Sequence, residues 1–204
     1  MKIVQLLPEL NEGGVERGVM ELSRELVKLG HESIVISAGG KLVEQIKKDG
    51  GAHITFDVYS KNLLTAPFRV LKLRKIIKEI KPDILHARSR VPAWLTYIAN
   101  KALHFPFVTT VHGFNSVNAY SKVMTYGDKV ICGSKFMIEH IMKHYQTPMD
   151  KIVLIPRGVD MNSFSKELDH GFIDDFKQKY QLDNAFVITQ VARITHWKDQ
   201  KTTI

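Results

Sequence analysis

The sequence has a single cysteine, no long hydrophobic run and no low-complexity tract. Cys132 has no second cysteine to pair with among the 204 residues, which excludes an intramolecular disulfide and favours a reducing cytosol. No stretch approaches the ~20 apolar residues of a membrane span, and the opening apolar run is too short for a signal peptide. We therefore expect a globular, cytoplasmic protein.

Acidic residues are scarce in one segment. The net charge is +8, and the content of 44% hydrophobic and 25% charged residues is typical of a soluble protein with a sizeable core. Residues 61–81 carry seven lysines and arginines against one acid, Glu79. This segment supplies most of the excess positive charge.

Short β-rich runs alternate with amphipathic helical stretches from the first residue onward. The expected strands are 2–7, 33–37, 53–56, 83–87, 107–111, 129–132 and 151–155. A first helix follows from the apolar spacing of Val15 to Leu29, with Gly30 as its stop. Further helices are expected at 41–49, 67–80, 92–104, 117–126 and 135–145, the last capped by Ser134. The alternation predicts an α/β fold with a Rossmann-like, doubly wound parallel sheet.

The pattern changes after residue 160. Residues 1–160 form the expected first domain, and 161–184 form a linker with a short helix near 172–180. Residues 185–204 are the expected start of a second domain, with a strand at 185–191 and a helix that begins at the last residues of the chain. We expect the chain to stop within that domain.

Candidate site residues follow the strands, where parallel sheets bind ligands. The glycine loop 13–18 lets backbone amides approach a ligand at a helix N-terminus, although a plain flexible turn would look similar. Its spacing is not that of a dinucleotide-binding loop, and no acid ends the second strand at 34–40, so nicotinamide chemistry is disfavoured.

Two histidines and two later cations are further candidates. His86 and His112 each follow a strand, where an imidazole can donate to a sugar hydroxyl or a phosphate, although single histidines are usually structural. Arg193 and Lys198 lie in a loop after the late strand and suit a diphosphate; a solvated basic loop is the alternative.

Four motifs together resemble glycosyltransferase family 4. They are the glycine loop 13–17, His112-Gly113, the segment 155–160, and 191–194 followed by Lys198. The resemblance implies one half of a two-domain GT-B fold that moves a sugar, with retention and without a metal, from a nucleoside diphosphate to a polysaccharide, lipopolysaccharide or lipid-linked acceptor. The family's paired glutamates would lie beyond residue 204, so we expect the chain alone to be inactive. Arg157 stands where many members have asparagine.

The resemblance also implies roles for individual residues. His112 is the expected catalytic residue, in contact with the transferred sugar. Donor binding is expected of Gly13, Gly14, Gly113, Arg193 and Lys198. Acceptor binding is expected of Glu16, Arg17, His86, Arg88 and Ser89.

The basic segment 61–81 is a separate candidate for a peripheral contact with an anionic membrane. Phe68 and Leu71 fall on the helix face that carries Lys72, Lys75 and Lys78, a mixture that suits such a surface. The alternative is a solvated helix. Nucleic acid is disfavoured because aromatic residues are not interleaved along the basic face.

Two other functions stay open at this point. The chain could be a non-catalytic module that binds sugar phosphates or polyanions, or part of a sugar-nucleotide epimerase of the same fold class. The identity of the products, or the lack of any, would separate these functions from sugar transfer.

Overall fold

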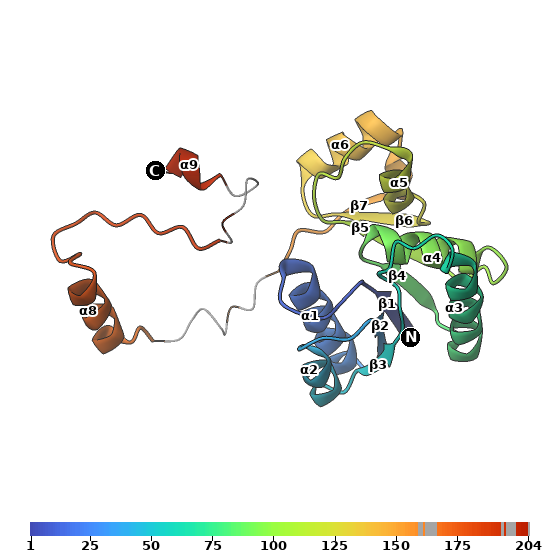
Figure 1. Cartoon of the computed structure of the whole chain (residues 1–204), viewed down its shortest axis with the longest axis horizontal. Coiled ribbons are helices and arrows are strands. Elements are labelled where there is room, and N and C mark those ends of the chain that lie inside the picture. Colours follow the sequence, from blue (N-terminus) through green and yellow to red (C-terminus); the bar gives the residue numbers. More distant parts are fainter. Residues whose placement is uncertain (159–160, 162–166, 193, 195–198, 204) are drawn as a thin grey trace. The chain divides into compact units, whose positions relative to one another are not determined.

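The computed structural model describes residues 1–158, 161, 167–192, 194 and 199–203 (Figure 1). The chain forms two compact units, Met1–Arg157 and Gly158–Ile204. The first unit contains the sheet and the candidate site, and the second is described separately.

The first unit is built on a seven-stranded parallel sheet in the order β3-β2-β1-β4-β5-β6-β7. The strands are β1 (Lys2–Leu6), β2 (Glu32–Ser37), β3 (Ala52–Thr55), β4 (Ile84–Ala87), β5 (Phe107–Val111), β6 (Lys129–Cys132) and β7 (Ile152–Leu154). All seven expected strands are confirmed, as is the doubly wound topology. The order reverses between β1 and β4, which creates the crevice in which such sheets bind ligands.

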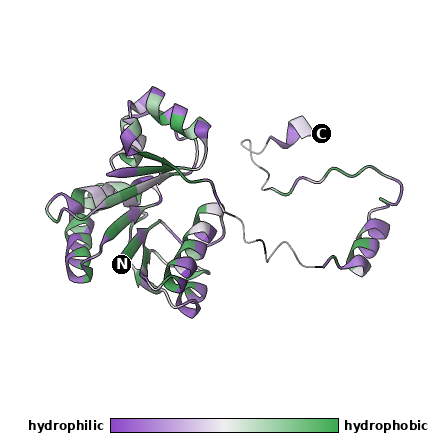
Figure 2. Ribbon diagram, turned by 180° about the vertical axis from the view of Figure 1, so that it is seen from behind, coloured by the Kyte–Doolittle hydropathy of each residue, from purple (hydrophilic) through white to green (hydrophobic). Residues whose placement is uncertain are grey.

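Helices cover both faces of the sheet (Figure 1), and the ribbon of the strands is coloured largely as hydrophobic (Figure 2). The helices α1 (Gly14–Lys28) and α2 (Val43–Lys48) pack on one face through Val19 and Ile46. The other face is covered by α3 (Ala66–Ile80), α4 (Arg90–Asn100), α5 (Ala119–Lys122), the 3-10 turn η1 (Val123–Thr125) and α6 (Lys135–Tyr145). A second 3-10 turn, η2 (Met149–Lys151), precedes β7. Cys132 is buried, as expected.

Two helices differ from their expected bounds for local reasons. The helix α4 begins at Arg90, two residues before the expected start, so Pro92 falls within its first turn. Proline is tolerated there because the backbone amides of a first turn have no partner within the helix. The helix ends at Asn100, whose side chain donates to the carbonyl of Phe105 and accepts from its amide, and so closes a turn instead of continuing the helix. The expected helix 117–126 is divided into α5 and η1.

The second unit contains α8 (His170–Lys179) and α9 (Gln200–Thr203), which confirms the expected helix near 172–180. The expected strand at 185–191 is wrong, because these residues form neither a strand nor a helix. A strand needs a hydrogen-bonded neighbour, and no described segment pairs with this one. Its apolar side chains are therefore exposed, with Phe186 and Val191 both 94% accessible.

The start of α6 provides a test of local stability. Ser134 accepts a hydrogen bond from the amide of Met137 at 3.3 Å, which confirms the expected cap. The substitution Ser134→Ala should lower the free energy of unfolding by about 1 kcal/mol in urea denaturation. Ser134→Asp, which keeps a capping oxygen, should retain most of that stability, and equal losses in both variants would contradict the capping role.

Candidate active site

The loop between β1 and α1 is held by the neighbouring loop between β2 and α2. The amide of Leu10 donates to the carbonyl of Gly39 at 2.8 Å, and the amide of Leu42 donates to the carbonyl of Leu10 at 2.8 Å. Gly40 adopts φ +140°, and a Cβ there would lie 2.6 Å from the carbonyl oxygen of Leu10. This contact fixes the segment that leads into Gly13, the residue that precedes α1.

A pocket of about 230 Å³ opens at the carboxyl ends of β1, β4 and β5. It therefore lies beside the reversal point of the sheet. The first turn of α1 and the segments that follow the three strands form most of its wall. The lining residues are Leu7, Pro8, Val15, Glu16, Arg88, Ser89, Arg90, Thr110, His112, Gly113, Asn115 and Met124.

A chain of hydrogen bonds runs from α1 through β1 to the pocket. Gln5, buried in β1, donates from Nε2 to the carbonyl of Val19 at 3.3 Å and accepts from Nη1 of Arg88 at 3.4 Å. Arg88 also donates from Nε to Nε2 of His112 at 3.1 Å. The relay ties His112 to α1 across two strand ends.

Both histidines of the site are neutral at pH 7. Although His112 is an exposed residue, desolvation of its ring and then the charges of Arg88 and Arg157 lower its pKa to about 4. His86 is buried beneath the pocket, 2.7 Å from the hydroxyl of Thr110, and burial holds its pKa well below the usual range. Each ring can therefore donate only one N–H. Burial, followed by the charge of Arg157, lowers the pKa of Arg88 to about 10, which leaves it cationic.

Two helices begin at the pocket without a side-chain cap. Gly13, which has no side chain, precedes α1, and the side chain of Ser89 precedes α4 without accepting a hydrogen bond from it. The first-turn amides therefore keep donor capacity, and the helix dipoles favour negative charge. With Arg88 and Arg90 in the wall, the pocket suits an anionic or hydroxyl-rich ligand.

The structure brings five of the expected site residues into one pocket: Glu16, Arg88, Ser89, His112 and Gly113. Gly13, Gly14 and Arg17 lie at the start of α1 but do not line the pocket. His86 does not line the pocket, and it contacts the pocket wall only through its hydrogen bond with Thr110. Arg193 and Lys198 lie outside the described residues.

Several residues of this site were not assigned from the sequence. Arg90 and Asn115 line the pocket, and Gln5 anchors Arg88. Arg157 reaches the glycines of α1, since a Cβ on Gly14 would lie 2.9 Å from its Nη1, and it pairs with Glu21 at 3.7 Å. The sequence signal for Gln5 was its position as a polar residue within the apolar strand 2–7, because a buried polar side chain requires a hydrogen-bond partner.

The buried His86 predicts a pH dependence of stability. The unfolded state takes up a proton near pH 6.5, whereas the folded state does so only at much lower pH, so stability is lost as pH falls. His86 alone should account for about 1 kcal/mol between pH 6.5 and 5.5. Urea denaturation should show a weaker pH dependence over this interval in His86→Gln, and an unchanged dependence would contradict the assignment.

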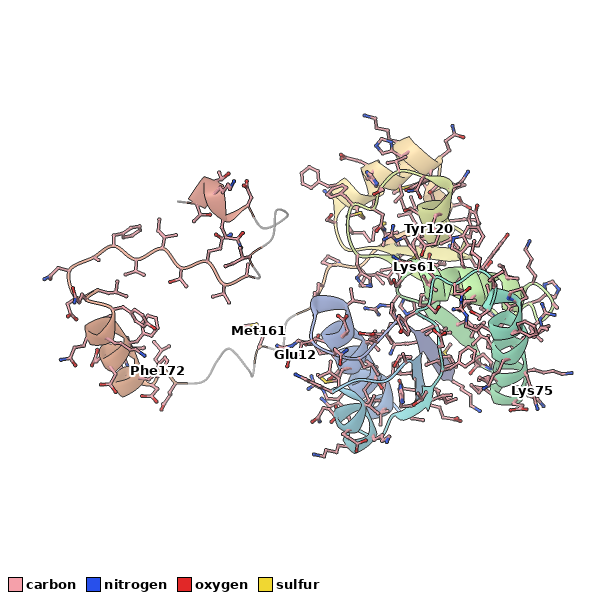
Figure 3. The ribbon with its side chains drawn as sticks, in the orientation of Figure 1. Glu12, Lys61, Lys75, Tyr120, Met161 and Phe172 are labelled. Carbon is pink, nitrogen blue, oxygen red and sulfur yellow. The ribbon has the colours of Figure 1, made fainter. Side chains whose placement is uncertain are left out.

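The membrane candidates lie on α3, among residues that do not line the pocket. Phe68 and Leu71 are 75% and 59% exposed, and the preceding Leu63 and Leu64 are 84% and 86% exposed. Lys72, Lys75 and Lys78 are also exposed, and Figure 3 shows the side chain of Lys75 extending outward from α3.

Two arginines of the basic segment turn inward and do not add to its surface charge. Arg69 is buried, with Nη2 donating to the carbonyl of Asn62 at 2.8 Å, and Arg74 donates to the carbonyl of Ala99 at 3.2 Å. The exposed cations of the segment are therefore its lysines. Among the described residues, no helix is long and apolar enough to cross a bilayer.

The fold and pocket define a Rossmann-like α/β domain with a pocket at the switch point of its sheet that suits an anionic or hydroxyl-rich ligand. The chain belongs to Glycosyltransferase Family 4, whose sequence profile matches residues 12–163.

Three proteins illustrate the relationship. The chain is 33% identical to the UDP-Gal:alpha-D-GlcNAc-diphosphoundecaprenol alpha-1,3-galactosyltransferase of Escherichia coli over 61% of this chain and 35% of that protein. It is 27% identical to the phosphatidyl-myo-inositol mannosyltransferase of Mycolicibacterium smegmatis over 75% and 42%. The crystal structure of a glycosyltransferase from Rickettsia africae superposes with a TM-score of 0.82 at 36% identity, covering 96% of this chain and 54% of that one. The chain thus spans between about a third and about half of these relatives.

Proposed function

We propose that this chain is the acceptor-side part of a hexosyltransferase that moves a sugar from a nucleoside diphosphate to a hydroxyl acceptor with retention. The observation that carries the proposal is the pocket at the reversal point of the sheet, in a member of Glycosyltransferase Family 4. It combines neutral and cationic hydrogen-bond donors, which suit sugar hydroxyls and phosphates respectively.

The two curated relatives support the choice of substrates. The name of the Escherichia coli enzyme specifies UDP-galactose as donor and a lipid-linked diphosphate as acceptor, and that of the mycobacterial enzyme specifies an inositol phospholipid. We extend this chemistry to a nucleotide-sugar donor and a glycan or lipid-linked acceptor. The cations and helix N-termini of the pocket support transfer without a metal, so excess EDTA should leave the rate unchanged.

The second unit fits the beginning of a donor-binding domain. The segment 185–191 is apolar and exposed, which is what a strand without its sheet would show. The chain divides into its two compact units after Arg157, so we propose a domain boundary near residue 160. We expect the donor site to need additional chain. The 204-residue chain alone should not transfer sugar.

The experiment is a transfer assay with the full-length protein and a panel of nucleotide sugars and lipid-linked acceptors, with products identified by mass spectrometry. A glycosylated acceptor in the α configuration from an α-linked donor supports retaining transfer, whereas an inverted product refutes retention. Binding without turnover would favour the non-catalytic module. Conversion of the free nucleotide sugar to its epimer would favour an epimerase.

We further propose that the lysine face of α3 and the leucines before it contact the anionic cytoplasmic leaflet. Exposed Leu63, Leu64 and Phe68 can enter the headgroup region while neighbouring lysines meet anionic lipid. Such lysines contribute about 1 kcal/mol each near a charged surface, which suffices for reversible binding.

Vesicle sedimentation of the full-length protein tests this surface. Lys72, Lys75 and Lys78 changed together to glutamate should lower binding to vesicles that contain phosphatidylglycerol at least tenfold, with little change on neutral vesicles. The matched control changes exposed Lys28, Lys47 and Lys48 to glutamate, which alters net charge equally away from α3. Equal binding by both variants would leave the helix as an ordinary solvated face.

A further inference from the structure

The contact between Arg88 and His112 specifies the protonation of the imidazole. An arginine Nε carries a hydrogen and can only donate, and it lies 3.1 Å from Nε2 of His112. Nε2 must therefore accept. A ring that accepts through Nε2 is neutral and carries its one proton on Nδ1.

That remaining proton is available to a ligand. Within the described part of the chain no residue forms a hydrogen bond with Nδ1 of His112, and the residue lines the pocket. The ring consequently offers one N–H donor, on a defined atom.

Arg88 is itself held by the fold. Its Nη1 donates to Gln5, which is anchored to the carbonyl of Val19. Its Nη2 lies close to Gly18 of α1, 3.4 Å from the position that a Cβ would take there. Two of its three guanidinium nitrogens are thus engaged within the protein. An arginine used in this way is better suited to orienting a neighbour than to binding a substrate.

We propose that Arg88 is a positioning residue, which holds His112 in its Nδ1–H form so that the ring donates a hydrogen bond to an oxygen of the transferred sugar. The proposal rests on the proposed transferase function and replaces the acceptor-binding role expected from the sequence. The predicted signature is a loss of turnover without a loss of acceptor affinity.

The direct test is ¹⁵N NMR of the full-length protein with labelled histidine, in which His112→Gln assigns the resonances. The wild-type ring should show a protonated Nδ1 and an unprotonated Nε2 at pH 7. In Arg88→Met, Nε2 should also become partly protonated. A wild-type ring with its proton on Nε2 overturns the proposal, and this result requires no activity.

Kinetics separate positioning from acceptor binding. Arg88→Met should lower kcat about tenfold and change the acceptor KM less than threefold. Arg88→Lys keeps the charge but not the planar fork, so it should lose most of the same turnover. A raised acceptor KM with unchanged kcat would restore the acceptor-binding role. If the wild type transfers no sugar, the proposed function fails while the NMR result still decides the role of Arg88.

The pH profile gives a third readout. The charged groups around His112 are Arg88, Arg157 with its partner Glu21, and Glu16 and Arg90 of the same pocket lining; the titratable His86 is buried nearby. In Arg88→Met the charge is lost, so the acid limb of the kcat/KM profile should shift from about pH 4 to higher pH. Arg88→Lys keeps the charge and should leave the limb at the same pH. An acid limb at the same pH in Arg88→Met would contradict this arrangement.

Discussion

Replacing His112 by alanine is expected to lower kcat/KM of the full-length enzyme by about a hundredfold. The ring lines the pocket with a single N–H, and removing one oriented donor from a site of developing charge typically costs this much. Burial and the neighbouring arginines lower its pKa to about 4, so the ring is neutral across the physiological range. The rate should therefore show no titration near pH 6.5.

The measurement is steady-state transfer from pH 5 to pH 8, with the free energy of unfolding followed in parallel. His112→Gln keeps an N–H donor and should recover part of the lost rate. His31→Gln is a control outside the pocket and should retain full activity. If His112→Ala were as active as the wild type, or if the wild-type rate fell with a pKa near 6.5, His112 would not be the neutral donor of this site.

The substitution Gly40→Ala is expected to lower the free energy of unfolding by about 3 kcal/mol or more. Its φ of +140° is a strained conformation for an L-residue. The added Cβ would also lie 2.6 Å from the carbonyl oxygen of Leu10 and 2.8 Å from the amide of Asn11. These are backbone atoms of the β1–α1 loop, so relief of the clash must move the segment that leads into Gly13.

Gly39→Ala provides a matched control for this prediction. Gly39 also has a positive φ, of +100°, but a Cβ there would meet nothing within 4 Å. Its substitution should cost only backbone strain, about 1–2 kcal/mol, and leave the pocket intact. Urea denaturation and transfer rates of both variants measure the difference. Equal losses of stability would show that the contact with Leu10 and Asn11 does not hold the loop.

Much of the fold follows from local pattern. Each strand is a short apolar run bounded by turn residues, and each crossover helix repeats its apolar residues at helical spacing. The cap at Ser134 follows from the same local chemistry. The segment 185–191 carries an equally clear strand pattern yet forms no strand, because pairing depends on a neighbour that local sequence does not contain.

The site is less visible in sequence because its contacts are long-range. Gln5 and Arg88 are 83 residues apart, and only the adjacency of β1 and β4 brings them together. The sequence does not distinguish Arg69 and Arg74 from the exposed cations of the segment 61–81. Their long side chains reach inward to backbone carbonyls. The strand-end positions of Arg88 and His112 were predictable, whereas their mutual orientation required the sheet order.

The most direct test of the account is a crystal structure of the full-length protein with an intact nucleotide sugar. The account predicts the sugar in the pocket at the carboxyl ends of β1, β4 and β5, with an oxygen within hydrogen-bond distance of Nδ1 of His112 and Arg88 still bonded to Nε2. A sugar bound away from this pocket, or a His112 that donates through Nε2, would contradict it.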